Sequence, residues 1–422
     1  MMLIESMTTP IQLLRSKVKG MLTARPDFRR AYLANAVSQL GDSFQFVAVV
    51  WLAVITGGTF GVIAVRLADG LPGLFLALHA GSSADRRDRR RTMVTADLVR
   101  GAVLAPVAVA GLTGHLSIWA VAPAGFVVAS ATSYFQPAFG ASLPVLAGRE
   151  NVQRANGLVS ATNSALMVTG RALAAALLAL ISIGSFFAVN AASFFVSAAL
   201  LARVRIPREL PVDGKLPNVA VREGFAALRV RPGLRVAIAM LAVGTAVMTG
   251  VWTVGVAELA RDRFGHGAAS LSLLLTATAI GSVSAGTLLV RRPMQMPVRS
   301  SCAAWLLLLP GYVLLGTAGS LPLALAGSFV VGVANGAALV LVTTAAQQSV
   351  PDELLGRVMG IVFLANVGAK PVGLLLVAPL YTLVGVRTMF VAGGIVAALA
   401  GTSAMRAVVA ATRMARPARA TA

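Results

Sequence analysis

Long apolar runs alternate with short polar segments along the chain, and this alternation predicts its secondary structure. Each run is about as long as the roughly 20 residues that an α-helix needs to cross the hydrocarbon core of a bilayer. We predict twelve membrane-spanning helices, with bounds good to about three residues, at residues 31–56, 59–83, 92–113, 116–144, 154–180, 184–203, 235–260, 267–290, 300–318, 321–349, 357–382 and 386–406.

Composition narrows the class further. Hydrophobic residues make up 57% of the chain and charged residues only 12%, whereas a soluble globular protein has about 25% charged residues. An outer-membrane barrel would show short segments of alternating polarity rather than long continuous runs. We therefore predict an all-α polytopic membrane protein.

The distribution of basic residues predicts how these helices are oriented. Gly81–Arg91, with the sequence GSSADRRDRRR, joins the second and third helices and carries five arginines. A short loop this basic is expected on the cytoplasmic side of a membrane. Three Lys or Arg fall on the opposite side and four inside the spans, which leaves 29 of the 36 on the side of this loop. Both termini are then expected in the cytoplasm, with the helices in a bacterial plasma membrane.

The net charge of +21 can indicate a nucleic-acid-binding protein. Here the basic residues lie in loops between apolar runs, so no nucleic-acid partner is expected. The only cysteine, Cys302, lies in an apolar run. A single cysteine excludes a disulfide framework within the chain.

Polar segments divide the chain into five parts. We predict a cytoplasmic tail (1–30), a six-helix bundle (31–203), a cytoplasmic central loop (204–234), a second six-helix bundle (235–406) and a second tail (407–422). The first tail lacks the apolar core of a cleavable signal peptide. Its residues 10–22 are either a short amphipathic helix on the membrane surface or a disordered segment.

Two short motifs occur once in each bundle. Gly81–Arg86 (GSSADR) follows the second helix and Gly286–Arg291 (GTLLVR) follows the eighth. Arg154–Gly157 (RANG) opens the fifth helix and Arg357–Gly360 (RVMG) opens the eleventh. The offsets, about 205 and 203 residues, nearly agree. They indicate two halves of parallel orientation, an arrangement that many secondary transporters build around a central cavity.

The loop after the second helix also resembles a known family signature, G-x-x-x-D-[RK]-x-G-[RK]-[RK], that of the major facilitator superfamily. Gly81, Asp85, Arg86, Arg89 and Arg90 fit this pattern, although Asp88 replaces its second glycine. Further segments resemble the enterobactin-exporter-like and macrolide-efflux-like branch, namely SQLGD (Ser38–Asp42), ADRRDRRR (Ala84–Arg91), FQPAFGASLP (Phe135–Pro144), RANGL (Arg154–Leu158), AASFF (Ala191–Phe195), REGFAAL (Arg222–Leu228) and PDELLGRVMG (Pro351–Gly360).

The resemblance implies a gate on the cytoplasmic side. In the superfamily the signature aspartate is thought to hold the two halves together, so Asp85 is expected to face the start of the eleventh helix near Arg357. Such a carboxylate is stabilised by a helix N-terminus and by a guanidinium. Arg154 occupies the matching place on the fifth helix and is assigned to the same gate. The alternative is that the arginines of the loop only anchor the topology.

Carboxylates inside the spans are candidates for carrying a proton. Asn35, Gln39 and Asp42 lie four and three residues apart and share one face of the first helix. A carboxylate removed from water holds its proton at a higher pH, so Asp42 can load and release one. We predict Asp42 as the main proton-coupling residue and Asp69 as a second candidate. The alternative is that Asp42 pairs with a basic group or caps a kink beside Gly41.

Two pairs of charges share a three-residue spacing along one helix. Arg66 and Asp69 can neutralise each other on the second helix, and Asp97 and Arg100 can do so on the third. We interpret the Asp97–Arg100 pair as structural because it lies toward the cytoplasmic end. For Arg66 and Asp69 a structural role and a role in the cavity stay equally open.

Cations in the fifth and eleventh helices bear on the substrate. Arg171 and Lys370 occupy near-equivalent places in the repeat, and Gly170-Arg171 stands where many drug–proton antiporters carry Gly-Pro. If both cations face the cavity, they give it a net charge of +1 with Asp42, which favours a substrate with an anionic or hydrogen-bond-accepting group. Alternatively, one or both pair with Asp42 or Asp69. The other predicted lining residues are Asn35, Gln39, Arg66, Gln136, Asn163, Trp252 and Asn366.

The sequence lacks the motifs of other energy sources. It has no G-x-x-x-x-G-K-[ST] phosphate loop and no His/Cys cluster with metal-ligand spacing, so no cofactor or metal is expected. No nucleophile and base pair suggests an enzyme. We expect a monomeric transporter that exports a small organic molecule (a drug, siderophore or secondary metabolite) in exchange for protons. The alternatives are an uptake permease or lipid transporter of the same fold, and a non-transporting receptor or scaffold.

Overall fold

The computed structural model describes residues 22–178, 180–206, 217–263, 267–292 and 294–414. The described residues form helices and no strands. The first group of helices comprises α2 (Pro26–Arg86), α3 (Arg89–Leu112), α4 (Ile118–Ala147), the short 3-10 turn η1 (Arg149–Asn151), α5 (Val152–Leu177) and α6 (Ile183–Ala202).

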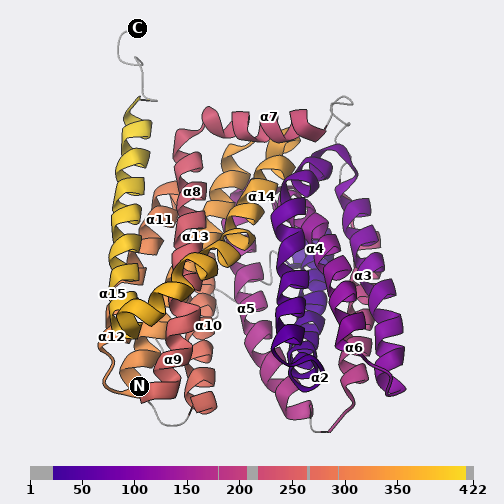
Figure 1. The fold of residues 1–422 in the computed structure, drawn as a ribbon. Helices are drawn as coiled ribbons and strands as arrows, with labels where there is room; N and C mark the ends of the chain where they lie inside the picture. Colours follow the sequence, from indigo (N-terminus) through magenta and orange to yellow (C-terminus); the bar gives the residue numbers. More distant parts are fainter. Residues whose placement is uncertain (1–21, 179, 207–216, 264–266, 293, 415–422) are drawn as a thin grey trace, which may run out of the picture.

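The second group follows a connecting helix, α7. Figure 1 shows the two groups side by side, with α7 lying across the end of the molecule between them. The helices from α7 onward are α7 (Pro217–Arg229), α8 (Pro232–Val247), the π-helical turn η2 (Met248–Trp252), α9 (Thr253–Arg263), α10 (Gly267–Arg291), α11 (Pro297–Ala304), η3 (Trp305–Leu307), α12 (Leu308–Thr317), α13 (Leu321–Ser349), α14 (Asp352–Val367) and α15 (Ala369–Met414).

The helix α2 contains both of the first two predicted spans. Its 61 residues would form a rod about 90 Å long, whereas one crossing needs only about 30 Å. Phe28 and Ala84, near its two ends, belong to the same cluster of buried apolar side chains. The helix therefore runs out and back, and the two predicted spans correspond to its two legs.

Ten helical segments within the described residues are long and apolar enough to cross a membrane. The return leg of α2 and the helix α5 are not among these ten, and adding them would give the predicted twelve. The polytopic, all-helical class predicted from composition is confirmed, and the count of twelve stays a prediction. The remaining predicted spans match the helices within a few residues at most ends.

The central segment differs from the expected loop. Residues 217–229 form α7, and 207–216 lie outside the described residues. In α7, Ala227 and Leu228 are buried, while Arg222 and Phe225 are exposed. Proline and charge in this stretch suggested an irregular loop, but tertiary packing stabilises a short helix that propensity alone does not predict.

Candidate functional site

A cavity of about 720 Å³ lies between the two groups of helices. Its wall is formed by α2, α4 and α5 from the first group and by α10, α13, α14 and α15 from the second. Apolar side chains make up much of the wall, and the polar lining residues are Asn35, Gln39, Asp42, Gln45, Asp69, Thr132, Ser133, Gln136, Asn156, Ser160, Asn163, Ser164, Ser282, Asn335, Thr343, Asn366 and Lys370.

Asp42 lies on this wall, as the amphipathic spacing of the first span predicts. Its Oδ1 accepts a hydrogen bond of 3.2 Å from Nδ2 of Asn190 on α6. The same Asn190 amide donates to Oε1 of Gln45, one turn further along α2, at 2.6 Å. Asn190 therefore ties the carboxylate to α6 and orients it at the edge of the cavity.

The neighbouring Gly41 permits this contact. A Cβ at Gly41 would overlap Oγ of Ser193 and Oδ1 of Asn190, so α2 and α6 approach more closely here than a side chain allows. Ser193 in turn donates to the backbone oxygen of Asn190 at 2.8 Å and to its Oδ1 at 3.0 Å. The close approach fixes Asn190 against Asp42, which the sequence alone did not indicate.

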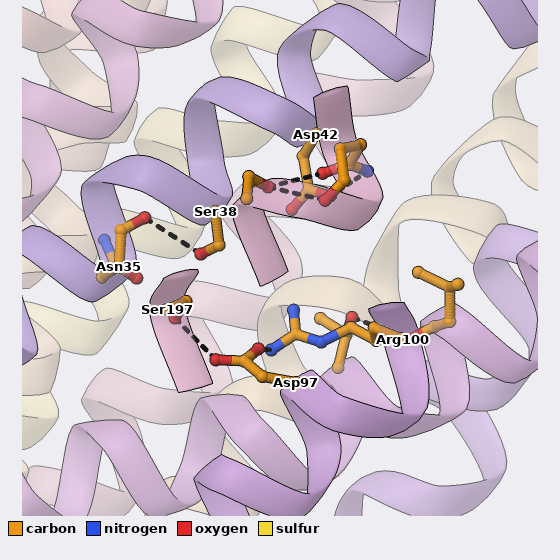
Figure 2. Close-up of polar contacts among 10 residues, drawn as sticks. Asn35, Ser38, Asp42, Asp97, Arg100 and Ser197 are labelled. Carbon is orange, nitrogen blue, oxygen red and sulfur yellow. Dashed lines mark hydrogen bonds and ion pairs between the residues drawn. The ribbon is translucent and has the colours of Figure 1, made fainter. Parts of the chain in front are cut away.

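The Asp97–Arg100 ion pair lies deeper, between α3, α4 and α6. Arg100 contacts Asp97 through Nη2, and the two side chains are 2% and 0% exposed. Ser197 on α6 donates its hydroxyl to the other carboxylate oxygen at 2.6 Å. Figure 2 shows this pair with Asp42 and Asn35 in one view. The local pairing agrees with the sequence-based prediction.

A second amide contact joins α2 to α5. Asn35 donates from Nδ2 to Oδ1 of Asn163 at 2.8 Å. Tyr32 lies about one turn before Asn35 on α2, and its hydroxyl is hydrogen-bonded to the hydroxyl of Thr162 at 2.8 Å. Both asparagines line the cavity. The predicted amides Gln39, Gln136 and Asn366 line it as well.

Arg171 and Trp252 differ from the expectation because neither belongs to the cavity wall. The guanidinium of Arg171 lies over the ring of Phe46, 3.8 Å from its centroid, and Phe46 itself lines the cavity. Trp252 lies in the π-helical turn η2. The side chain of Arg66 lies outside the described residues.

The charge on the wall changes accordingly. Of the described ionisable side chains, Asp42, Asp69 and Lys370 line the cavity, so two carboxylates face one ammonium. The expected net charge of +1 required Arg171 on the wall, and helical spacing cannot fix such a side-chain direction. Both carboxylates lie on the first group of helices and Lys370 lies on the second.

The cavity is closed at the end that carries Gly81–Arg91, here called the basic face. Arg89 donates to the backbone oxygen of Asp352 at 2.7 Å, and Arg149 forms an ion pair of 2.6 Å with the carboxylate of the same residue. Gln347 donates to the backbone oxygen of Gly140 at 2.6 Å. Asp352 and Gln347 belong to the second group and the others to the first, so these contacts join the halves.

Four glycines of the two repeated motifs meet at this closure. A Cβ at Gly81 would lie 2.8 Å from Cα of Gly360, and a Cβ at Gly157 would lie 2.8 Å from the backbone oxygen of Gly286. The return leg of α2 thus packs backbone to backbone on α14, and α5 does so on α10. The internal repeat therefore marks two equivalent crossings between the halves.

At the other end, the lining reaches Val121, near the first residue of α4, and includes the exposed side chains of Asp69 and Lys370. The helix α4 runs from this end to the basic face, where Arg89 donates to the backbone oxygen of Ala141. The cavity is therefore sealed toward the basic face and extends toward the opposite one.

The residues predicted to form the gate differ in the contacts that they make. Arg357 is buried, and its ion pair is with Glu223 of α7, while Arg154 donates to Asn151 at 3.1 Å. The side chains of Asp85 and Arg86 lie outside the described residues, so the predicted Asp85 contact stays a prediction. Arg90 is half-buried.

Sequence reasoning missed several residues that the fold brings together. Asn190, Gln45, Asn156, Arg149, Gln347, Asp352 and Glu223 all take part in contacts at the cavity or its closure. A polar stripe on α6 was a legible signal, because Asn190, Ser193 and Ser197 are spaced three and four apart in an apolar run. The contacts at the basic face join distant segments and left no local pattern.

A comparison with protein families decides the class of this chain. Residues 31–374 match the family model described as Major Facilitator Superfamily. The chain belongs to this superfamily. The resemblance found in the signature loop is thereby confirmed.

Curated relatives and solved structures extend this result. Macrolide efflux protein A of Streptococcus pyogenes is 27% identical over 52% of this chain and 55% of its own length, so the chain spans about half of that relative. Enterobactin exporter EntS of Salmonella choleraesuis is 28% identical over 84% of this chain and 85% of its own. A bacterial homologue of the iron transporter ferroportin, crystallised in an outward-facing state, superposes with a TM-score of 0.73 at 16% identity, covering 92% and 99% of the two chains.

Membership of the family fixes the general class. The chain is a multi-pass membrane protein of a family of transporters. The central cavity offers room for a small molecule.

Proposed function

We propose that this member of the major facilitator superfamily exports a small organic molecule across the bacterial plasma membrane in exchange for protons. The observation that carries the proposal is the central cavity with Asp42 on its wall, closed at the basic face and extending to the opposite face. Exporters for macrolides and for enterobactin among the relatives support the direction of transport.

The proposed mechanism uses the two groups of helices as rigid halves, 31–203 and 235–406. In this arrangement the basic face is the cytoplasmic side, as the excess of Lys and Arg there favours. The closed contacts around Asp352 then correspond to an outward-facing state. Breaking them would let the halves rock about the site and open the cavity to the cytoplasm.

The cavity wall suggests what kind of molecule fits. Amide side chains on both halves offer donors and acceptors to oxygen-rich groups, and Lys370 attracts an anionic or accepting group toward the second half. Asp42 and Asp69 lie on the first half and would repel an anion when ionised. A substrate with acceptor groups turned to Lys370 and a neutral or cationic part turned to α2 matches this distribution.

The location of Asp42 supports the proposed proton exchange. When ionised, the carboxylate disfavours an anionic substrate and attracts a cationic or donor group. When protonated, it loses this charge and weakens that attraction. Loading of a proton from the outside can therefore compete with the departing substrate, and release to the cytoplasm prepares Asp42 for the next substrate molecule.

Substrate-induced proton release from purified protein in detergent tests the proposal. The candidate panel holds a macrolide, a catecholate siderophore and a lipophilic cation, added to the parent protein, to Asp42→Asn and to Asp27→Asn. Asp27 is a matched control because its carboxylate pairs with Arg30 outside the cavity. We expect a panel member to release protons from the parent and from Asp27→Asn, and Asp42→Asn to abolish this release.

Equal release from Asp42→Asn and the parent would exclude Asp42 as the proton carrier and would shift the assignment to Asp69. Tight binding of a panel member without proton release from the parent would contradict proton exchange altogether. Transport into rather than out of right-side-out vesicles would show an uptake permease instead.

A further inference from the structure

The polar stripe on α6 connects the cavity carboxylate to the buried ion pair behind it. Asn190 donates to Asp42 on α2, and Ser197 donates to Asp97 on α3. The two positions are seven residues apart, or two turns, which is ~10 Å along the helix axis. Ser193, between them on the same face, holds the amide of Asn190. One helix face thus joins two carboxylates from two different helices (Figure 2).

Arg100 lies on the side of Asp97 that faces Asp42. The helix α3 runs away from the basic face, so Arg100 is one turn further from that face than Asp97. Asp42 is also further from it, because α6 runs toward the basic face and Asn190 precedes Ser197. The guanidinium lies over the ring of Phe194, which stands on α6 between Asn190 and Ser197.

The guanidinium also has donor capacity to spare. Arg100 is 2% exposed and lies between the rings of Phe135 and Phe194, 4.6 Å and 4.4 Å from their centroids. Its Nη2 contacts Asp97, but its Nε has no hydrogen-bond partner among the described residues. A buried donor left unused is costly.

Charge counting then limits the protonation states. Arginine keeps its proton in proteins, so this group of two carboxylates and one guanidinium has a net charge of −1 when both acids are ionised. Uptake of one proton makes it neutral. In a membrane interior the neutral form is strongly favoured over a buried net charge, and two carboxylates that share one cation titrate as a unit.

We propose that Asp42, Asp97 and Arg100 act as one charge cluster that takes up a single proton, and that Asp97 and Arg100 are positioning residues that set the pH at which Asp42 loads it. The proton binds at Asp42 from cavity water and leaves by the same route, while Arg100 balances the remaining carboxylate. This inference rests on the proposed proton exchange at Asp42.

Other charged groups also lie around the cavity that Asp42 faces. Asp69 on the return leg of α2 adds negative charge to the same cavity, and Lys370 on α15 faces it from the second half. Arg171 on α5 lies over Phe46. The helix α6 carries no ionisable side chain, and α4 carries only Tyr134, which is hydrogen-bonded to His79.

The test is the pH midpoint of substrate-induced proton release in three variants of the full chain. In Asp97→Asn, Arg100 has only Asp42 to balance, so the ionised form gains stability and the midpoint falls by about one pH unit, a tenfold change in proton affinity. In Ser197→Ala, the ionised Asp97 loses a hydrogen bond, so the midpoint rises by ~0.5 unit. Ser142→Ala is the control, because Ser142 is a buried serine that donates only to the backbone oxygen of Ala138.

Opposite shifts in Asp97→Asn and Ser197→Ala, with no shift in Ser142→Ala, would support the cluster. Unchanged midpoints in both variants, with release still lost in Asp42→Asn, would overturn the cluster and leave the proposed proton exchange intact. Release that persists in Asp42→Asn would overturn the exchange itself. If Asp97→Asn fails to fold, the upward shift in Ser197→Ala decides the question alone.

Discussion

At the scale of single residues, the surroundings of Asp42 depend on the absence of a side chain at Gly41. The glycine lets α2 approach α6 until Asn190 reaches the carboxylate. The sequence indicated Asp42 through its place on a polar helix face, and in the structure Asp42 lines the cavity. Its partner Asn190 lies 148 residues away, and no local pattern joins the two.

Replacement of Gly41 by alanine tests this packing. The new Cβ would overlap Ser193 and Asn190, and overpacking of this kind costs about 1–3 kcal/mol. We expect Gly41→Ala to lower the thermal unfolding temperature in detergent. Gly70→Ala, in the same helix, is the matched control because nothing lies within 4 Å of a Cβ there. It is expected to gain up to about 1 kcal/mol from helix propensity. Equal unfolding temperatures for the two variants would contradict the close approach.

At the scale of elements, the crossings of α2 on α14 and of α5 on α10 explain why the repeated motifs carry glycines. Gly81 meets Gly360 and Gly157 meets Gly286 without side chains between the backbones. Helices held this close gain many small contacts but tolerate no added side chain. The two crossings therefore help to close the cavity at the basic face, and separating the helices there should open the cavity to that side.

Gly360→Val is expected to separate α14 from α2, since a Cβ there would lie 2.7 Å from the backbone oxygen of Ala77. A cysteine introduced at Ser160 on the cavity wall reports the result, because Cys302 is buried. In the parent, a thiol reagent should label Ser160→Cys from the face opposite the basic face. In Gly360→Val it should also label from the basic face.

Gly233→Ala serves as the control for this experiment, because a Cβ there meets only ordinary contacts at 3.5 Å and 3.8 Å. Its labelling should match the parent. A Gly360→Val protein that is folded and still labels from one face only would show that the crossing does not govern access.

At the scale of the whole molecule, the two groups of helices meet at one face and leave the cavity between them toward the other. Asp352 is held by Arg89 and Arg149, and α7 is held to α14 through Glu223 and Arg357. Arg89 of the signature loop therefore does more than anchor the topology, because it takes part in the closure.

Cysteine labelling of intact cells checks the orientation of the molecule. His115 and Met296 are exposed at opposite ends, in the connections before α4 and before α11. With the basic face in the cytoplasm, a membrane-impermeant maleimide should label His115→Cys from outside. Met296→Cys should label only after the cells are permeabilised. The reverse pattern would invert the proposed topology and with it the direction of transport.

The sequence by itself determined the all-helical membrane class, most helix ends, the internal repeat and, through its motifs, the family, and it predicted part of the cavity wall. These follow from local patterns, namely the length of apolar runs, the side that collects arginine and the spacing of Asn35, Gln39 and Asp42 on one helix face. Spanning helices can be predicted without knowledge of their neighbours, because each segment in the hydrocarbon core must satisfy its own backbone hydrogen bonds.

Tertiary structure alone decided which side chains meet. It turned Arg171 onto Phe46 rather than onto the cavity wall, paired Arg357 with Glu223, folded residues 217–229 into a helix and joined Asp42 to α6 through Asn190. The physical reason is that a side chain adopts the conformation whose contacts with all neighbours within reach give the lowest free energy. Those neighbours come from helices that are distant in the sequence.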